Sequence, residues 1–98
     1  MQDTAFNRAV SNVGIRNVFR ASGRAIQIAC LIRSDDWRPL RAHWWRGKEV
    51  FVIGADVSGN FFLRHCDGSV RYWKHDSQRD EIIANSVDEF ARGIIETE

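Results

Sequence analysis

The pattern of apolar and polar positions predicts a β-hairpin in the middle of the chain. Residues 61–66 and 69–74 are rich in aromatic and aliphatic side chains, and Asp67-Gly68 separates them. Asp-Gly between two such runs is typical of a two-residue type I′ turn, because glycine tolerates the positive φ that this turn requires. The predicted cross-strand pairs are Leu63 with Tyr72, His65 with Val70, Phe62 with Trp73 and Arg64 with Arg71.

A helix is predicted near the C-terminus. The run Ser86-Val87-Asp88-Glu89 fits a capping box, in which the first hydroxyl and the last carboxylate satisfy free amides of the opening turn. Apolar residues then recur at helical spacing, namely Val87, Phe90, Ala91, Ile94 and Ile95. We expect this stripe to pack on the core, although Gly93 weakens the helix interior by about 1 kcal/mol.

Further strands are predicted in the first half of the chain. They are residues 17–21, 25–33 and 48–53, the first two joined through Ser22-Gly23. Residues 4–10 have the pattern of a short helix, while Pro39 leaves 37–46 open between loop and strand. The predicted fold class is therefore α+β, an antiparallel sheet of four to six strands with a C-terminal helix packed on it.

Length and composition indicate one globular domain over residues 1–98. The chain is 44% hydrophobic and 28% charged, with a net charge of +1. No apolar run approaches the roughly 20 residues that span a bilayer. The first ten residues mix Asp3, Asn7 and Arg8 with few apolar ones, unlike a secretory signal. We expect a cytoplasmic protein without membrane association.

The cysteines and histidines do not form a recognisable site. Cys30 and Cys66 are far apart in strand-like segments, so we expect buried free thiols and no disulfide. Together with His43, His65 and His75 they supply zinc-ligand types, but no CxxC or HxxxH spacing is present. Nothing near either cysteine indicates an oxyanion hole. The sequence therefore predicts no metal, no cofactor and no catalytic residue.

The glycine-containing segment 54–60 predicts a turn. It lacks the lysine of a phosphate-binding loop, and it holds one carboxylate where a calcium loop needs several. We expect Asp56 and Asn60 to bond local amides.

Four tryptophans in a chain of 98 residues mark the candidate binding residues. Tryptophan and arginine dominate binding hot spots, and segment 37–46 is rich in both. Arg71, Trp73 and His75 alternate along one strand face. The candidate partner-binding residues are Trp37, Trp44, Trp45, Arg46, Arg71, Trp73 and His75. The competing interpretation, that these aromatics fill a small core, stays open.

The same segment 37–46 is compatible with a second class, a small nucleic-acid-binding or regulatory protein. Arginines contact phosphates and aromatic rings stack on bases in such proteins. A net charge of +1 argues against this class, because nucleic-acid binders carry a basic excess. The salt dependence of binding distinguishes the protein-binding class from the nucleic-acid-binding class, because binding to nucleic acid weakens steeply as salt is added.

Residues 48–94 resemble the SUKH superfamily, which includes many bacterial immunity proteins and a fungal cell-wall-synthesis regulator. The motifs that carry the resemblance are Val52-Ile53-Gly54, the loop 55–60, Phe61-Phe62-Leu63, Asp67-Gly68, Val70-Arg71-Tyr72-Trp73, His75-Asp76, and 82–86 leading to Glu89-Phe90. They cover about half of the chain. Val57-Ser58 stands where many members are richer in glycine, and residues 1–32 have no counterpart, as in an N-terminally reduced member.

The resemblance implies an α+β fold and a protein-binding role, typically the neutralisation of a partner toxin in bacterial competition. The function expected on this basis is that of a non-enzymatic, immunity-type binding module. A sheet edge left open by the short N-terminal part would also allow pairing with a second copy, and hence a homodimer.

Overall fold

One antiparallel sheet dominates the fold. The computed structural model describes residues 6–7, 17–21, 24–41, 45, 49–77 and 79–96. Its strands are β1 (Asn17–Ala21), β2 (Arg24–Leu31), β3 (Val50–Asp56), β4 (Phe61–His65), β5 (Val70–Lys74), β6 (Arg79–Ala84) and β7 (Ile94–Glu96). Their order in the sheet is β6-β5-β4-β3-β2-β1-β7. The α+β class is confirmed, but the prediction of four to six strands is wrong, because the described residues form a sheet of seven.

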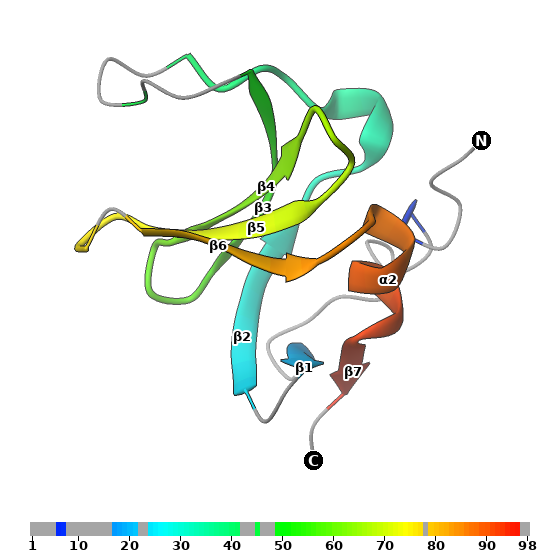
Figure 1. Ribbon diagram of the computed structural model, residues 1–98. Helices are drawn as coiled ribbons and strands as arrows, with labels where there is room; N and C mark the ends of the chain where they lie inside the picture. The colour runs from blue at the N-terminus through cyan, green and yellow to red at the C-terminus, as the bar shows by residue number, and fades with distance from the viewer. Residues whose placement is uncertain are drawn as a thin grey trace.

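The sheet is strongly curled, and one short helix lies on its open side. The helix α2 (Val87–Arg92) connects the two edge strands, β6 and β7 (Figure 1). Register shifts between Ile28 and Cys30 on β2, and between Val52 and Gly54 on β3, bend the sheet. Gly54 permits the close approach of the two strands, since a Cβ there would lie 2.7 Å from the Cys30 carbonyl oxygen.

The β4–β5 hairpin is present, but its register differs by one residue from the prediction. The observed pairs are Phe61 with Trp73, Phe62 with Tyr72, Leu63 with Arg71 and Arg64 with Val70. The turn has three residues, because the His65 N–H donates to the Ser69 carbonyl at 2.9 Å. Gly68 takes a φ of +91°, and the Asp67 carboxylate accepts the Ser69 N–H at 2.9 Å. This side-chain bond favours the longer loop, which also separates Arg64 from Arg71.

The helix begins as predicted and ends early. The Ser86 hydroxyl accepts the Glu89 N–H at 3.0 Å, and the stripe residues Val87, Phe90 and Ala91 are buried. Ile94 and Ile95 are not helical but belong to β7, where Ile95 lies opposite Val18 of β1. Gly93 stops the helix against Phe19, whose Cε1 lies 2.5 Å from where a Cβ of residue 93 would stand. Pairing with β1 therefore replaces the last predicted turn.

The core has two parts, one on each face of the sheet. The inner cluster lies between the curled sheet and α2 and contains Phe6, Phe19, Ile26, Ile28, Leu31, Ile53, Phe62, Val70, Tyr72, Ala84, Val87, Phe90 and Ala91. The outer cluster contains Val50, Leu63 and Trp73, with Leu40, Trp45, Val52 and Phe61 packed against it. Neighbouring residues such as Phe62 and Leu63 enter different clusters because successive side chains of a strand point to opposite faces.

The other local predictions have mixed outcomes. Strand 25–33 is present as β2, and β1 pairs with it antiparallel as expected. Strand 48–53 is observed from Val50 and continues to Asp56. Pro39 forms an isolated bridge with Phe51. A 3-10 helix, η1 (Ser34–Asp36), follows β2.

Phe6 and Asn7 are helical, whereas the rest of the predicted helix 4–10 lies outside the described residues. Cys30 and Cys66 are free thiols, as expected, but the prediction that they are buried is wrong. Cys66 lies in the longer hairpin turn, and Cys30 follows the bulge in β2. Within the described part of the chain, no helix has the length and apolar character needed to cross a membrane.

Candidate functional site

The outer face of β4, β5 and β6 carries the first candidate surface. We call outer face the group Trp45, Leu63, His65, Arg71, Trp73, Asp80 and Ile82. Arg71 lies opposite Leu63 on one side and opposite Ile82 on the other. From Leu63 to Ile82 the exposure rises, since Leu63 is buried, Arg71 is half-buried and Ile82 is 58% exposed. An exposed isoleucine at the sheet edge thus adjoins an arginine and a buried apolar cluster.

Two tryptophans form the apolar part of the outer face. The rings of Trp45 and Trp73 meet edge to face, with their centroids 5.3 Å apart. Trp45 also stands edge-on to His65 at 6.2 Å. Trp73 is 8% exposed, whereas Trp45 is half-buried. Trp73 therefore packs beneath Trp45, and of the two rings Trp45 presents more surface to a partner.

A polar cluster lies beside the two tryptophans. His65 Nε2 lies 3.1 Å from Asp80 Oδ2, and Arg71 NH1 approaches the same oxygen at 3.5 Å. Arg71 NH2 is also 3.6 Å from Asp67 Oδ2. Burial lowers the pKa of His65 below its ordinary value. The negative charge of Asp80 opposes this shift, and the positive charge of Arg71 adds to it. Hydrogen bonds from Ser69 lower the pKa of Asp67.

The structure brings together only part of the predicted site. Trp45, Arg71 and Trp73 share the outer face, whereas Trp37 packs against the inner cluster. The indole N–H of Trp37 donates to the Ile32 carbonyl at 2.7 Å, and its ring meets Phe6 edge to face at 5.5 Å.

The remaining predicted residues lie elsewhere. His75 is exposed just beyond β5, where its N–H donates to Asn60 Oδ1 at 3.2 Å. Trp44 and Arg46 lie outside the described residues. Ile82 and Asp80 were not among the predicted contact residues, although their alternation along β6 indicates a shared face.

A second feature is a buried carboxylate where β3 turns into β4. Asp56 is 6% exposed, and its Oδ1 accepts the N–H groups of Ser58 at 2.9 Å and Asn60 at 2.8 Å. Its Oδ2 accepts the Asn60 amide at 3.2 Å and the Tyr72 hydroxyl. The predicted bonding to local amides is confirmed for Asp56, whereas the Asn60 side-chain oxygen accepts the more distant N–H of His75. Burial alone would raise the pKa of Asp56, but the hydrogen bonds from Tyr72, Asn60 and Ser58 outweigh it and lower that pKa.

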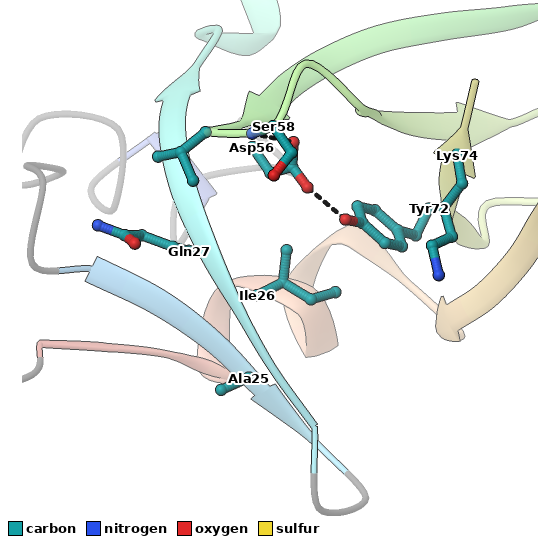
Figure 2. Close-up of a pocket in the computed structure, with 8 residues that line it drawn as sticks. Ala25, Ile26, Gln27, Asp56, Ser58, Tyr72 and Lys74 are labelled. Atoms are coloured by element: carbon teal, nitrogen blue, oxygen red, sulfur yellow. Dashed lines mark hydrogen bonds between the residues drawn. The ribbon is translucent and has the colours of Figure 1, made fainter. Parts of the chain in front are cut away.

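This carboxylate forms part of the wall of a pocket of about 220 Å³. The pocket opens between β2, the β3–β4 turn and β5 (Figure 2). Its lining residues are Ala25, Ile26, Gln27, Asp56, Val57, Ser58, Tyr72 and Lys74. Figure 2 shows Lys74 extending from β5 beside Tyr72, across the pocket from Ile26. Most of the pocket lining is polar, and Lys74 is the cationic side chain among the lining residues.

The described residues contain no group of three His, Cys, Asp or Glu side chains placed to hold a metal ion. Comparison with protein-family models, curated proteins and solved structures finds no match for this chain.

Proposed function

We propose that this chain is a non-enzymatic, protein-binding module of the immunity type that acts in the cytoplasm, and that its outer face contacts the partner. The observation that carries the proposal is the position of Ile82. It is 58% exposed on edge strand β6, directly opposite half-buried Arg71 and on the face that carries the Trp45–Trp73 pair. An exposed aliphatic side chain beside an arginine and a tryptophan has the composition of a binding hot spot.

The edge position of β6 supports the same proposal. β6 hydrogen-bonds to β5 on one side and ends the sheet on the other, with no described strand beyond it. Alternate backbone groups of such a strand point away from the sheet and can pair with an extended segment of another protein. A partner on the outer face would then gain main-chain bonds along β6 in addition to contacts with Ile82.

The resemblance to SUKH proteins supports the immunity-type part of the proposal. The order β3, turn, β4–β5 hairpin, β6 and α2 is the order of elements that the resemblance implies. On this proposal the partner is a toxin, and binding blocks a functional surface of that toxin without any chemical step.

The nucleic-acid alternative has less support. Trp37 is held in the core by its hydrogen bond to Ile32, so it is not free to stack on a base. Arg41 lies 3.6 Å from the Glu49 carboxylate, which neutralises it in part. They are two of the six tryptophan and arginine residues of segment 37–46.

The proposal is tested by capturing partners from the native cells with the tagged protein at low and high salt. Ile82→Glu places a charge on the outer face, and Ile95→Glu is the matched control on the other edge strand, where Ile95 is 40% exposed. We expect one protein to be retained at high salt by the parent and by Ile95→Glu, and to be lost with Ile82→Glu. Thermal unfolding must show both variants folded.

Two outcomes would contradict the proposal. If Ile82→Glu keeps the partner at full affinity, the outer face does not contact it. If the captured material is nucleic acid that is released by salt, the chain belongs to the alternative class.

A further inference from the structure

The two edges of the sheet differ in how well they are protected against a further strand. β7 is three residues long, whereas β6 is six residues long and contains neither proline nor lysine. Short length, proline and lysine are devices that keep an edge strand from pairing with another chain. The bulge that leaves Ile83 without a cross-strand partner on β5 lies in the second half of β6. β6 is therefore the edge on which a further strand can add.

The second half of β6 is apolar and accessible. Its charged residues occupy positions 79–81, and Ile82-Ile83-Ala84 follows them. Among the large apolar side chains that the structure describes, Ile82 is the most exposed, at 58%. Arg71, on the β5 side of Ile82, covers it only in part. A strand that pairs with β6 therefore has apolar surface to bury in addition to backbone groups to bond.

Symmetry restricts how two copies of β6 can pair. A two-fold axis perpendicular to the sheet makes the strands antiparallel and places one residue opposite the same residue of the second copy, because opposite side chains point to one face. At positions 79–81 this would bring like charges together, which destabilises a strand pair. At Ile83 it would place Ile82 of the outer face opposite Ala84, which is buried in the inner cluster. At Ile82 two exposed aliphatic side chains meet, and Glu81 lies opposite Ile83 of the second copy.

We propose that the free chain forms a symmetric dimer, in which β6 pairs antiparallel with β6 of a second copy and Ile82 lies at the two-fold axis. The two seven-stranded sheets then join edge to edge. The pairing satisfies the outward backbone groups of β6 and buries Ile82. It occupies the edge that the outer-face proposal assigns to a partner protein, so self-pairing and partner binding exclude each other on one chain. The inference goes beyond the proposed function and does not depend on it.

The first test is sedimentation velocity of the purified full chain from about 10 μM to about 1 mM. We expect a species of twice the mass of the chain to grow with concentration. Ile82→Glu places two like charges at the axis and should weaken the dimer by at least about tenfold. Ile95→Glu makes the same substitution on the other edge strand, where Ile95 is 40% exposed, and should leave the dimer unchanged. Thermal unfolding checks that both variants are folded.

A disulfide tests the register. Cys30 and Cys66 are exposed and are first replaced by serine, after which a single cysteine is introduced as Ile82→Cys or as Arg79→Cys. In the proposed register the two copies of residue 82 lie opposite each other, about 4.5–5.5 Å apart between Cα atoms, within the reach of a disulfide. The two copies of residue 79 are about 20 Å apart along the strand. With oxidised glutathione we expect a covalent dimer from Ile82→Cys and none from Arg79→Cys, although both positions are exposed.

Four results would overturn the inference. They are a parent chain that stays monomeric up to about 1 mM, an Ile82→Glu variant that dimerises as well as the parent, a larger loss of dimer with Ile95→Glu, and equal cross-linking of the two cysteine variants. No partner protein is used, so each of these results leaves the outer-face proposal standing. Conversely, a chain that dimerises through β6 but whose Ile82→Glu variant keeps the partner would contradict the proposed function alone.

Discussion

The Tyr72 hydroxyl donates a hydrogen bond to the buried Asp56 carboxylate and so ties β5 to the turn between β3 and β4. The Asn60 amide donates to both groups, at 3.2 Å in each case. The hydrogen bonds among Asp56, Asn60 and Tyr72 stabilise the carboxylate charge of Asp56, which would otherwise be costly to bury. It also positions the pocket wall relative to Lys74.

Removing this hydrogen bond should destabilise the fold. Tyr72→Phe keeps the ring that stacks on Phe62 but leaves Asp56 with one donor fewer. We expect a loss of about 1–3 kcal/mol in the free energy of unfolding, measured with urea. Ser58→Ala is the control, because it removes an exposed hydroxyl and should change stability by less than about 0.5 kcal/mol. Equal effects of the two substitutions would show that the bond to Asp56 contributes nothing.

The pH dependence of stability should reveal the state of Asp56. Because its pKa in the folded chain is below the ordinary 3.8, the unfolded chain takes up the proton first as the pH falls. The stabilisation is therefore complete well above pH 3.8 and is lost as the pH falls through the lower folded-state pKa. We expect Asp56→Asn to be less stable than the parent at neutral pH. Urea unfolding from about pH 6 to about pH 2 should show this difference narrowing, and a constant difference would contradict the interpretation.

His65 should give a second pH effect, at higher pH. Burial lowers its pKa below the ordinary 6.5, so the unfolded chain binds a proton at His65 before the folded chain does. Stability should be complete above pH 6.5 and decline as the pH falls below that value. We expect His65→Gln to flatten the decline between about pH 7.5 and about pH 5.5. His75→Gln removes an exposed histidine and should retain the slope of the parent. If the stability of His65→Gln falls with pH as steeply as that of the parent, His65 is not the source of the decline.

Gly54 should tolerate no side chain. A Cβ at this position would lie 2.7 Å from the Cys30 carbonyl oxygen and 2.8 Å from Leu31 Cδ2, so β2 and β3 would have to separate. We expect Gly54→Ala to cost at least about 2 kcal/mol in thermal or urea unfolding. Gly68→Asn serves as the comparison. Gly68 has a φ of +91° with no atom within 4 Å of the added Cβ, and asparagine tolerates this backbone. A smaller cost at Gly54 than at Gly68 would mean that the strands separate easily.

Much of the local structure was predictable from the residues themselves. The Ser86 cap, the Asp56 turn and the hairpin around Asp67-Gly68 were all anticipated at the correct place. The hydrogen bonds of the cap, of the Asp56 turn and of the hairpin loop join residues no more than four positions apart, so the determinants lie within a short stretch of chain. The antiparallel pairing of β1 with β2 was predictable for the same reason, because one short connection joins the two strands.

A tertiary contact decided one feature that was predicted wrongly, and a local hydrogen bond decided another. Ile94 and Ile95 fit a helical stripe, but pairing with β1, from the far end of the chain, makes them a strand. The hairpin register differs by one residue from the prediction because the Ser69 N–H donates to the Asp67 carboxylate, and this local bond stabilises the longer turn. A shift of one residue changes the partner of every side chain along both strands.

The candidate surfaces, too, were predictable in part from the sequence and depend in part on the tertiary structure. Trp45, Arg71 and Trp73 were predicted from the sequence because tryptophan and arginine are frequent in binding sites. Only the folded sheet places these three residues on one face and Trp37 on the other. The pairs Arg71–Ile82 and Lys74–Arg79 exist because β6 lies beside β5 in one particular register. The periodicity of apolar residues along a strand predicts which residues share a face of that strand. Which strand lies next to it, and in which register, depends on packing between distant segments, so binding surfaces that span several strands are set by the tertiary structure.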